Sequence, residues 1–462
     1  MTRQDVVWVT LESVRWDHTS LSERSRDTTP TLSRLAAEGR SYDDCFSHDI
    51  WTRASTASIL TGRASSAHRT WSNDAALPDS IATIPEAFGD AGYRTVGISP
   101  NGQFGPGTGL DRGFDDFHYL TRSTLVSEAG LPSLLRWAAN LRRHSGGITR
   151  DGNQHCLGYL STNVAKRHIR RASTGEEPLF LYVHYGDSHH AYVPPIAWRD
   201  RFADDLPMPV DEAVDIALDM SDRMYEHIAA TDPFDDDEWT ALRTLYDTAI
   251  AYVDHLTGEL VSAARQRLND PVIVVTADHG ELFGERGLLA HMLVNNAAVA
   301  NVPLVVAGAN EFPEAGPIQH ADVMKMLCRD LDVDHPVPVG RDLREEEREF
   351  TVVQRGGART RNKLAQITKH NRAFPEGEYH TDDVTALFTP EWCYRRTDDD
   401  EELVARGTDE ADVSDTRPTV TAELREECQR WLAEHGQPVG QTGRADFDEN
   451  TEAQLRELGY LQ

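Results

Sequence analysis

Short apolar runs alternate with longer helical patterns through the first three quarters of the chain. Continuous apolar runs of this kind are typical of strands that are buried on both faces, as in a mostly parallel sheet. The pattern therefore predicts one large, mostly parallel sheet. Its expected strands are VVWVTL (6–11), RTVGIS (94–99), PLFLYVHY (178–185), PVIVVTA (271–277) and VPLVVAG (302–308).

Helical periodicity between the apolar runs predicts the helices of this fold. Apolar residues recur at helical spacing from about residue 238 to residue 268. Because helices that connect parallel strands pack on both faces of the sheet, we expect a sheet sandwiched by helices. Two polar segments are interpreted as surface loops, FADDLPMPVDEAVDIALDM (202–220) and the acidic run 408–416.

The pattern changes after about residue 345. The segments FTVVQ, TALFT and EWCYRRTDDDEELVARG are typical of hairpin strands, and a helical pattern follows from about 420 to 435. We therefore predict two domains, a large α/β domain over residues 1–345 and a small α+β C-terminal subdomain over residues 346–462.

Charge narrows the range of partners. Acidic residues outnumber basic residues 76 to 46, which gives a formal charge of −30 spread along the chain. Such a surface repels a phosphate backbone, so nucleic acid is excluded as a partner. Only four of the basic residues are lysines, and a dispersed acidic surface that uses arginine suits a protein kept soluble in high salt. We expect a salt-adapted source, a halophilic archaeon.

Cysteine usage and hydropathy indicate the compartment. The five cysteines show no paired spacing, and an odd number cannot all form internal disulfides, which favours a reducing compartment. The N-terminal MTRQDVVWVTLES enters an apolar strand without a charged leader. No apolar run reaches the length of about 18 residues that a membrane span needs. We expect a cytoplasmic protein with no transmembrane segment.

Polar residues follow directly after three of the predicted strands. Glu12 and Ser13 end the first, HYGDSHHAYVPP ends the third and TADHGELFGERG ends the fourth. In such sheets ligands bind beyond the carboxyl ends of the strands. A carboxylate near an Asp-His pair suits Mn²⁺, Zn²⁺, Mg²⁺ or Ca²⁺. The alternative for Asp278 and His279 is an N-cap of a following helix.

The stretch DIWTRASTASILTG (49–62) places the hydroxyl of Thr52 in front of a helix-compatible run. One interpretation makes Thr52 an ordinary helix cap. The other makes it a nucleophile, because a helix N-terminus directs backbone N–H groups at an anion and a divalent cation activates a hydroxyl.

The order of seven segments resembles that of the sulfatase family in the alkaline-phosphatase superfamily. The resemblance covers nearly the whole chain and implies an alkaline phosphatase-like α/β fold. Its segments are VVWVTLESVRWDH, WTRASTASILTG, GLDRGFDDF, PLFLYVHYGDSHHAYVPP, YDTAIAYVDHLTGEL, TADHGELFGERG and the closing LRELGYLQ.

Carried over position by position, the resemblance implies a site with one divalent metal ion. It makes Glu12, Asp278 and His279 metal ligands and Thr52 the nucleophile bound to the same ion. His189 and His291 match family positions that contact the transferred group or protonate the leaving group.

Other polar residues near these segments are weaker candidates. Asn101, Arg15 and His190 are expected to contact substrate less directly. Arg15 is more typical of a residue that supports the site, and the Asn-Gly pair at Asn101 is typical of a turn. His184 lies within an apolar strand and is interpreted as a core histidine.

The departures from the family pattern bear on the reaction. Sulfatases oxidise a Cys or Ser to formylglycine, whereas Thr52 would give a ketone, so the resemblance here implies no formylglycine. A Glu, a Thr and an Asp-His pair resemble the site of lipoteichoic acid synthases and phosphoethanolamine transferases, which use a phosphothreonine. A second metal would need a histidine at position 191, which is Ala191.

The leading hypothesis is metal-dependent cleavage or transfer of a phosphate or sulfate ester through Thr52, with phosphoester chemistry favoured. One alternative is a true sulfuric ester hydrolase that acts on a sulfated sugar without formylglycine. A second alternative is a non-catalytic scaffold. The substrate is expected to be a small molecule or a glycan or lipid ester, selected by loops 118–160 and 196–236. The sequence leaves the oligomeric state open.

Overall fold

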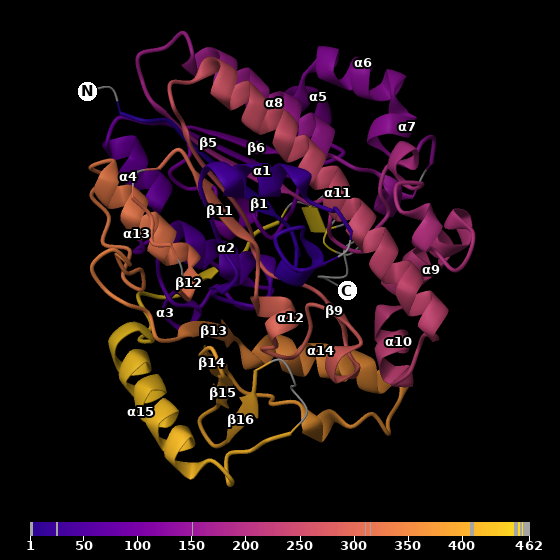
Figure 1. Cartoon of the computed structure of the whole chain (residues 1–462), viewed down its shortest axis with the longest axis vertical. Coiled ribbons are helices and arrows are strands. Elements are labelled where there is room, and N and C mark those ends of the chain that lie inside the picture. Colours follow the sequence, from indigo (N-terminus) through magenta and orange to yellow (C-terminus); the bar gives the residue numbers. More distant parts are fainter. Residues whose placement is uncertain are drawn as a thin grey trace.

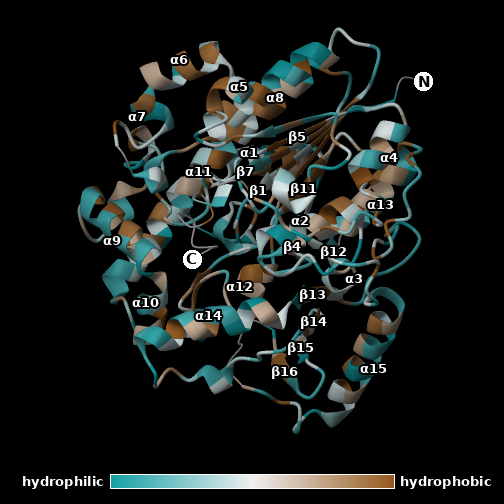
Figure 2. Ribbon diagram, turned by 180° about the vertical axis from the view of Figure 1, so that it is seen from behind, coloured by the Kyte–Doolittle hydropathy of each residue, from teal (hydrophilic) through white to brown (hydrophobic). Residues whose placement is uncertain are grey.

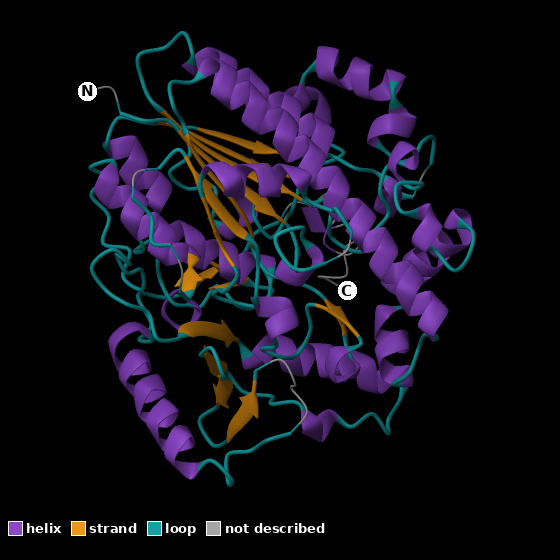
Figure 3. Ribbon diagram, viewed as in Figure 1, coloured by secondary structure: helices purple, strands orange, loops and turns teal. Residues whose placement is uncertain are grey.

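A central sheet of seven strands organises the fold (Figure 3). The computed structural model describes residues 3–24, 26–149, 151–309, 311–314, 316–406, 411–447, 451–452 and 455. In sheet order the strands are β2 (Arg40–Tyr42), β11 (Leu304–Ala307), β8 (Val272–Ala277), β1 (Val6–Leu11), β7 (Leu179–Tyr185), β5 (Arg94–Ser99) and β6 (Asp116–Tyr119).

The middle of the sheet is parallel, as the apolar runs predict. β1 pairs in parallel with β7 on one side and β8 on the other, and Val6 lies opposite both Phe180 and Val272. All residues of β1, β7 and β8 are buried, which explains why these runs carry no alternation of polar and apolar residues. The strands predicted at 6–11 and 94–99 are confirmed at those bounds.

The strand predicted at 302–308 differs in direction. β11 runs antiparallel to β8, and β2 runs antiparallel to β11. The connection from β8 to β11 contains the short strands β9 (Leu282–Phe283) and β10 (Leu289–Ala290) and the four-residue helix α12 (Ala297–Ala300). A helix of that length, about 6 Å, cannot carry the chain back across the sheet, so the next strand starts from the edge where β8 ends.

Helices cover both faces of the sheet, as predicted (Figure 1). On one face lie α1 (Pro30–Glu38), α8 (Gly158–Ala172) and α11 (Asp236–Arg267), and α11 confirms the helix expected from 238 to 268. On the other lie α2 (Thr52–Thr61), α4 (Ile84–Asp90) and α13 (His320–Asp330). Shorter helices flank this sandwich: α3 (Ser65–His68), α5 (Leu125–Ala129), α6 (Leu131–Ala139), α7 (Leu141–His144) and α10 (Met224–Ala230).

One predicted surface loop is wrong. Helix α9 (Val210–Asp222) occupies the second half of the segment 202–220. Its buried side chains have the spacing of one helical face, namely Ala213, Val214, Ala217 and Met220. The acidic residues between them lie on the outer face, so the high proportion of Asp and Glu conceals an amphipathic helix.

A second sheet follows the first, as the change of pattern predicts. Strands β13 (Thr351–Arg355), β14 (Val384–Phe388), β15 (Trp392–Arg396) and β16 (Glu401–Ala405) form an antiparallel sheet with α14 (Gly357–His370) and α15 (Pro418–His435). After the second sheet the chain comes back to the N-terminal part of the fold, where β17 (Gly443–Arg444) pairs with β4 (Ala75–Ala76). Residues 408–410 of the acidic run, and residues 456–462 of the closing segment, lie outside the described residues.

The core is apolar and contains all five cysteines. In Figure 2 the strands of the central sheet are coloured hydrophobic. All five cysteines are buried and form no disulfide, as the odd count and irregular spacing suggest. Among the described residues, no helix combines the length and apolarity that crossing a bilayer requires.

Candidate active site

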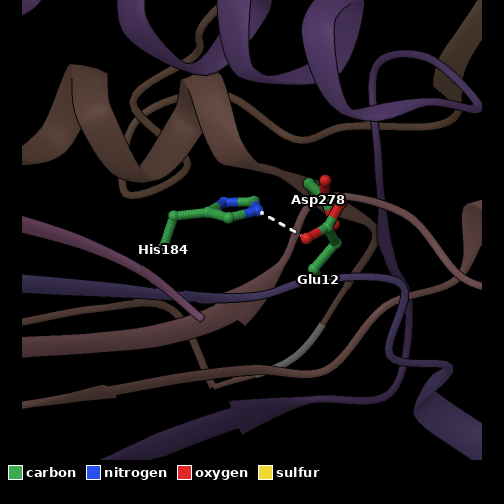
Figure 4. Close-up of side chains that lie close together, drawn as sticks. All are labelled: Glu12, His184 and Asp278. Atoms are coloured by element: carbon green, nitrogen blue, oxygen red, sulfur yellow. Dashed lines mark ion pairs between the residues drawn. The ribbon is translucent and has the colours of Figure 1, made fainter. Parts of the chain in front are cut away.

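The ends of two neighbouring strands bring the predicted carboxylates together. β1 leads directly into Glu12 and β8 leads directly into Asp278, and both side chains are buried (Figure 4). The backbone N–H of Ser13 donates a hydrogen bond of 3.0 Å to Asp278 Oδ1, which fixes one strand end to the other. The parallel register of β1 and β8 therefore sets the position of both carboxylates.

Thr52 lies beside these carboxylates at the start of α2. Trp51 occupies the N-cap position and Thr52 is the first helical residue, so the interpretation of Thr52 as a helix cap is wrong. Its hydroxyl donates to Glu12 Oε1 over 3.2 Å, and its Oγ lies 3.3 Å from His279 Nε2. The hydroxyl is buried among residues that the family resemblance implies to be metal ligands.

Asp278 and His279 lie in an irregular turn after β8. No helix begins there, so their alternative role as an N-cap is wrong. The carbonyl of Asp278 accepts a 2.6 Å hydrogen bond from Ser55 Oγ, which ties α2 to the end of β8. His279 Nδ1 lies 2.9 Å from the carbonyl of Gly280. Because Nδ1 must donate to that carbonyl, the lone pair of His279 is on Nε2, the atom that faces Thr52.

His184 belongs to this cluster although the sequence indicates only a core residue. It is fully buried in β7, and its Nε2 lies 3.3 Å from Glu12 Oε2 (Figure 4). Burial opposes protonation of His184, but contact with the carboxylate of Glu12 outweighs it and raises the pKa of His184. The only signal in the sequence is its position next to the end of a strand adjacent to β1.

The donor set fits a divalent cation. Ligand atoms of Glu12, His184 and Asp278 lie within 4.8 Å of one another, and His279 Nε2 lies 3.5 Å from Asp278 Oδ2. Within the described part of the chain, Asp278 Oδ2 is buried without a hydrogen bond, which is costly unless another group satisfies it. Burial opposes ionisation of Glu12, yet its interactions with the imidazoles of His189 and His184 lower its pKa, so Glu12 can serve as an anionic ligand.

Three further histidines gather above this cluster. The ring centroid of His291 lies 4.4 Å from that of His279 and 5.3 Å from that of His189. The ring of His190 lies 3.9 Å from His189. Burial lowers the pKa of His189, His190 and His291, so these imidazoles are neutral near neutral pH and can accept a proton.

Hydrogen bonds orient two of these rings. His291 Nδ1 lies 2.9 Å from Glu281 Oε1, and His189 Nδ1 lies 2.8 Å from the carbonyl of His190. The carbonyl of His190 can only accept, so Nδ1 of His189 donates and the basic atom of His189 is Nε2. Glu281 follows the Asp-His pair closely, but sequence patterns do not identify it as a partner of His291.

The weaker candidates separate into two groups. Asn101 lies in the site, where its Nδ2 donates to Glu12 Oε1, and its Oδ1 also accepts the N–H of Gln103 as a turn residue does. The guanidinium of Arg15 instead forms ion pairs with Asp17 (2.8 Å) and Glu285 (2.6 Å). Arg15 therefore anchors the loop after β1, as a supporting residue does.

A lysine distant in the sequence lies close to these histidines. Lys363 of α14 is buried, and its Nζ donates a 2.7 Å hydrogen bond to the hydroxyl of Tyr225. The pKa of His190 is lowered mainly by burial, then by His189 and by the charge of Lys363. The sequence shows no lysine near His291. The effect of Lys363, which lies on α14, can therefore be seen only in the fold.

A cavity of about 540 Å³ opens beyond the carboxyl ends of β1, β5 and β7. Glu12, Asn101, His189 and His190 form part of its lining, and its outer wall includes Leu125 and Trp137. A Cβ atom at Gly186 would lie 3.1 Å from Glu12 Oε2, so glycine allows the end of β7 to approach the carboxylate closely.

The chain is similar to several known proteins. The model of the family described as Sulfatase matches residues 4–329. The chain belongs to the sulfatase family. Its relatives include the uncharacterized sulfatase YidJ of Escherichia coli, which is 24% identical over 331 residues that cover 67% of this chain and 64% of YidJ.

Two other proteins extend the comparison. The choline-sulfatase of Rhizobium meliloti is 26% identical over 65% of this chain and 62% of its own length. This sulfatase-family chain therefore spans less than two thirds of each of these two relatives. The phosphonate monoester hydrolase of Silicibacter pomeroyi has the same fold, with a TM-score of 0.69 over 94% of this chain and 96% of that chain at 18% identity.

Proposed function

We propose that this sulfatase-family chain is a metal-dependent hydrolase or transferase of phosphate or sulfate esters that acts through Thr52, with phosphoester chemistry favoured. One observation carries the proposal. The Thr52 hydroxyl lies within 3.3 Å of both Glu12 and His279 at the start of α2. A threonine cannot be oxidised to formylglycine, so the hydroxyl itself is the nucleophile that this position offers.

Four residues would hold the metal ion: Glu12, Thr52, Asp278 and His279, with His184 next to Glu12. A divalent cation, Mn²⁺, Zn²⁺, Mg²⁺ or Ca²⁺, would stabilise the alkoxide form of a hydroxyl and the negative charge on the transferred group. The N-terminal N–H groups of α2 point toward the same place and also favour an anion.

The proposed reaction has two steps, transfer of the phosphoryl or sulfuryl group to Thr52 and then its transfer to water or an acceptor. First, Thr52 Oγ forms a bond to phosphorus or sulfur while the bond to the leaving oxygen breaks. The proton of Thr52 passes through the imidazole lone pair of His189 or His291 to that leaving oxygen. Water, or the hydroxyl of an acceptor, then attacks the same phosphorus or sulfur while the bond to Thr52 Oγ breaks, and the proton of the attacking group passes through His189 or His291 to the released Thr52 oxygen.

A second function is supported by family membership. The family model and the choline-sulfatase favour a true sulfuric ester hydrolase that acts on a sulfated sugar or a small sulfate ester without formylglycine. The likeness to a phosphonate monoester hydrolase favours phosphorus chemistry instead. A non-catalytic scaffold would have no need for a buried, unsatisfied Asp278 oxygen next to Glu12.

A substrate panel distinguishes these functions. We expect the purified chain, with each of the four metals in turn and at high salt, to cleave an aryl phosphate diester or phosphonate monoester at least tenfold faster than an aryl sulfate. Product absorbance gives kcat/KM for each ester. A larger kcat/KM for the aryl sulfate would favour the sulfuric ester hydrolase. No cleavage of any ester, together with no bound metal by elemental analysis, would favour the scaffold.

A further inference from the structure

Exposed apolar side chains gather in one segment of the molecule. Among the described residues, the large apolar side chains that lie exposed are Val126 (67%), Leu131 (61%), Leu135 (61%) and Ile148 (99%). All four fall within residues 122–149, here named the α5–α7 cap. Figures 1 and 2 show these helices at the outer edge of the molecule, with hydrophobic positions along α6.

Helix α6 is apolar on its outer face as well as its inner face. Leu134 and Trp137 pack against the core, whereas Leu131 and Leu135, four residues apart, share a neighbouring side of the helix and are exposed. No residue of α6 is buried. Exposed leucines side by side on one helix, such as Leu131 and Leu135, are typical of a surface that binds something.

The charge of the cap is opposite to that of the chain. Residues 122–149 contain four arginines and one acidic residue, Glu128, although the whole chain carries a formal charge of −30. Arg136, Arg142 and Arg143 are exposed, and in the described part of the chain their side chains form no ion pair. Exposed apolar residues flanked by unpaired arginines are typical of a surface that lies on an anionic membrane interface.

We propose that the α5–α7 cap docks on the surface of an anionic lipid bilayer, with Leu131 and Leu135 in the interface and Arg142 and Arg143 against the headgroups. A second copy of this chain fits the cap less well. A two-fold contact between two caps would bring together two surfaces that each carry Arg136, Arg142 and Arg143, and these like charges would repel one another.

The inner side of the cap leads to the active site. Leu125, Trp137 and Arg122 line the same cavity as Glu12 and His189. A bilayer held by the outer side would therefore present headgroups near the entrance of that cavity. This step rests on the proposed function, and it assigns the substrate class as the phosphate or sulfate ester of an amphiphile headgroup.

Vesicle sedimentation tests the docking surface without any turnover. We expect the full chain to pellet with vesicles of phosphatidylglycerol and phosphatidylcholine, not with phosphatidylcholine alone, and to be released as salt rises. The paired variants Leu131→Gln/Leu135→Gln and Arg142→Gln/Arg143→Gln should each weaken vesicle binding at least about tenfold. The first pair loses the apolar area that enters the interface, and in the second pair each lost arginine costs about a few-fold in affinity.

A matched control lies at the end of α8. Arg170 and Arg171 are also consecutive arginines in the last turn of a helix, and Arg170→Gln/Arg171→Gln should pellet like the unaltered chain. Thr52→Ala should also pellet normally, so the docking surface and the proposed chemistry can fail independently. Circular dichroism confirms that each variant is folded.

Three results would overturn the proposal. The first is that the chain does not pellet with anionic vesicles. The second is that the Leu131/Leu135 and Arg142/Arg143 variants bind as well as the control. The third is that light scattering shows a dimer that Leu131→Gln/Leu135→Gln dissociates while vesicles bind no protein, which would make the cap a contact between copies of this chain.

Discussion

Replacing Thr52 by alanine should abolish ester cleavage, with a fall in kcat on the order of 10⁴-fold or more. The hydroxyl is the only atom lost near Glu12 and His279 that can attack phosphorus or sulfur. The fold should survive, because the net loss of a hydroxyl contact costs about 1 kcal/mol. Initial rates on the best ester of the panel, with thermal unfolding measured in parallel, give both quantities.

Two further variants make this result specific. Thr52→Ser keeps the hydroxyl and should retain measurable activity. Thr61→Ala removes another buried threonine of α2, whose Oγ donates only to the carbonyl of Ala57 over 2.7 Å, and should leave kcat within about twofold, because surface and local changes away from the site seldom reach the chemistry. Full activity in purified Thr52→Ala would show that Thr52 is not the nucleophile.

Replacing Asp278 by asparagine should remove the metal ion and the activity together. The variant keeps an oxygen that can accept the N–H groups of Ser13 and His279, but it loses the negative charge on the buried, unsatisfied oxygen. We expect metal affinity to fall by at least about 100-fold, since changes to groups that only support ligands already cost 10–100-fold. Elemental analysis after dialysis and a metal titration of activity measure the loss.

Asp254 provides the matched control. It is also buried, and its carboxylate accepts the backbone N–H groups of Thr31 (3.0 Å) and Leu32 (3.1 Å) at the start of α1. Asp254→Asn changes the charge of a buried aspartate with two backbone donors without touching the cluster around Thr52. An Asp278→Asn protein that keeps both its metal content and its activity, as Asp254→Asn should, would contradict the assigned ligand set.

The sequence predicts the centre of the fold because burial on both faces leaves a clear pattern. Strands such as 6–11 and 94–99 contain only residues that a buried parallel strand accepts, and the structure confirms them. The direction of β11 cannot be read from its residues, because a strand buried on both faces has the same composition in either direction. It depends on the connection after β8, where no long helix is available.

The site is predictable where its residues follow strand ends. Glu12 and Asp278 stand directly after apolar runs, and Thr52 is the first residue of a helix. His184 is missed because a residue inside an apolar strand carries no sign of which neighbour it faces. Lys363 is missed for a different reason, since its position depends on the packing of α14 against α10, far away in the sequence.

Detection of the covalent intermediate tests the central claim most directly. His291→Ala or His189→Ala should slow the second step and allow the intermediate to accumulate, because each histidine supplies proton transfer worth about 10²–10⁴-fold. The protein is mixed with the best ester, quenched within the first turnovers, digested and analysed by tandem mass spectrometry. The account predicts one phosphoryl or sulfuryl group on Thr52. The same group on a different residue, or turnover in which every peptide containing Thr52 remains unmodified, would contradict it.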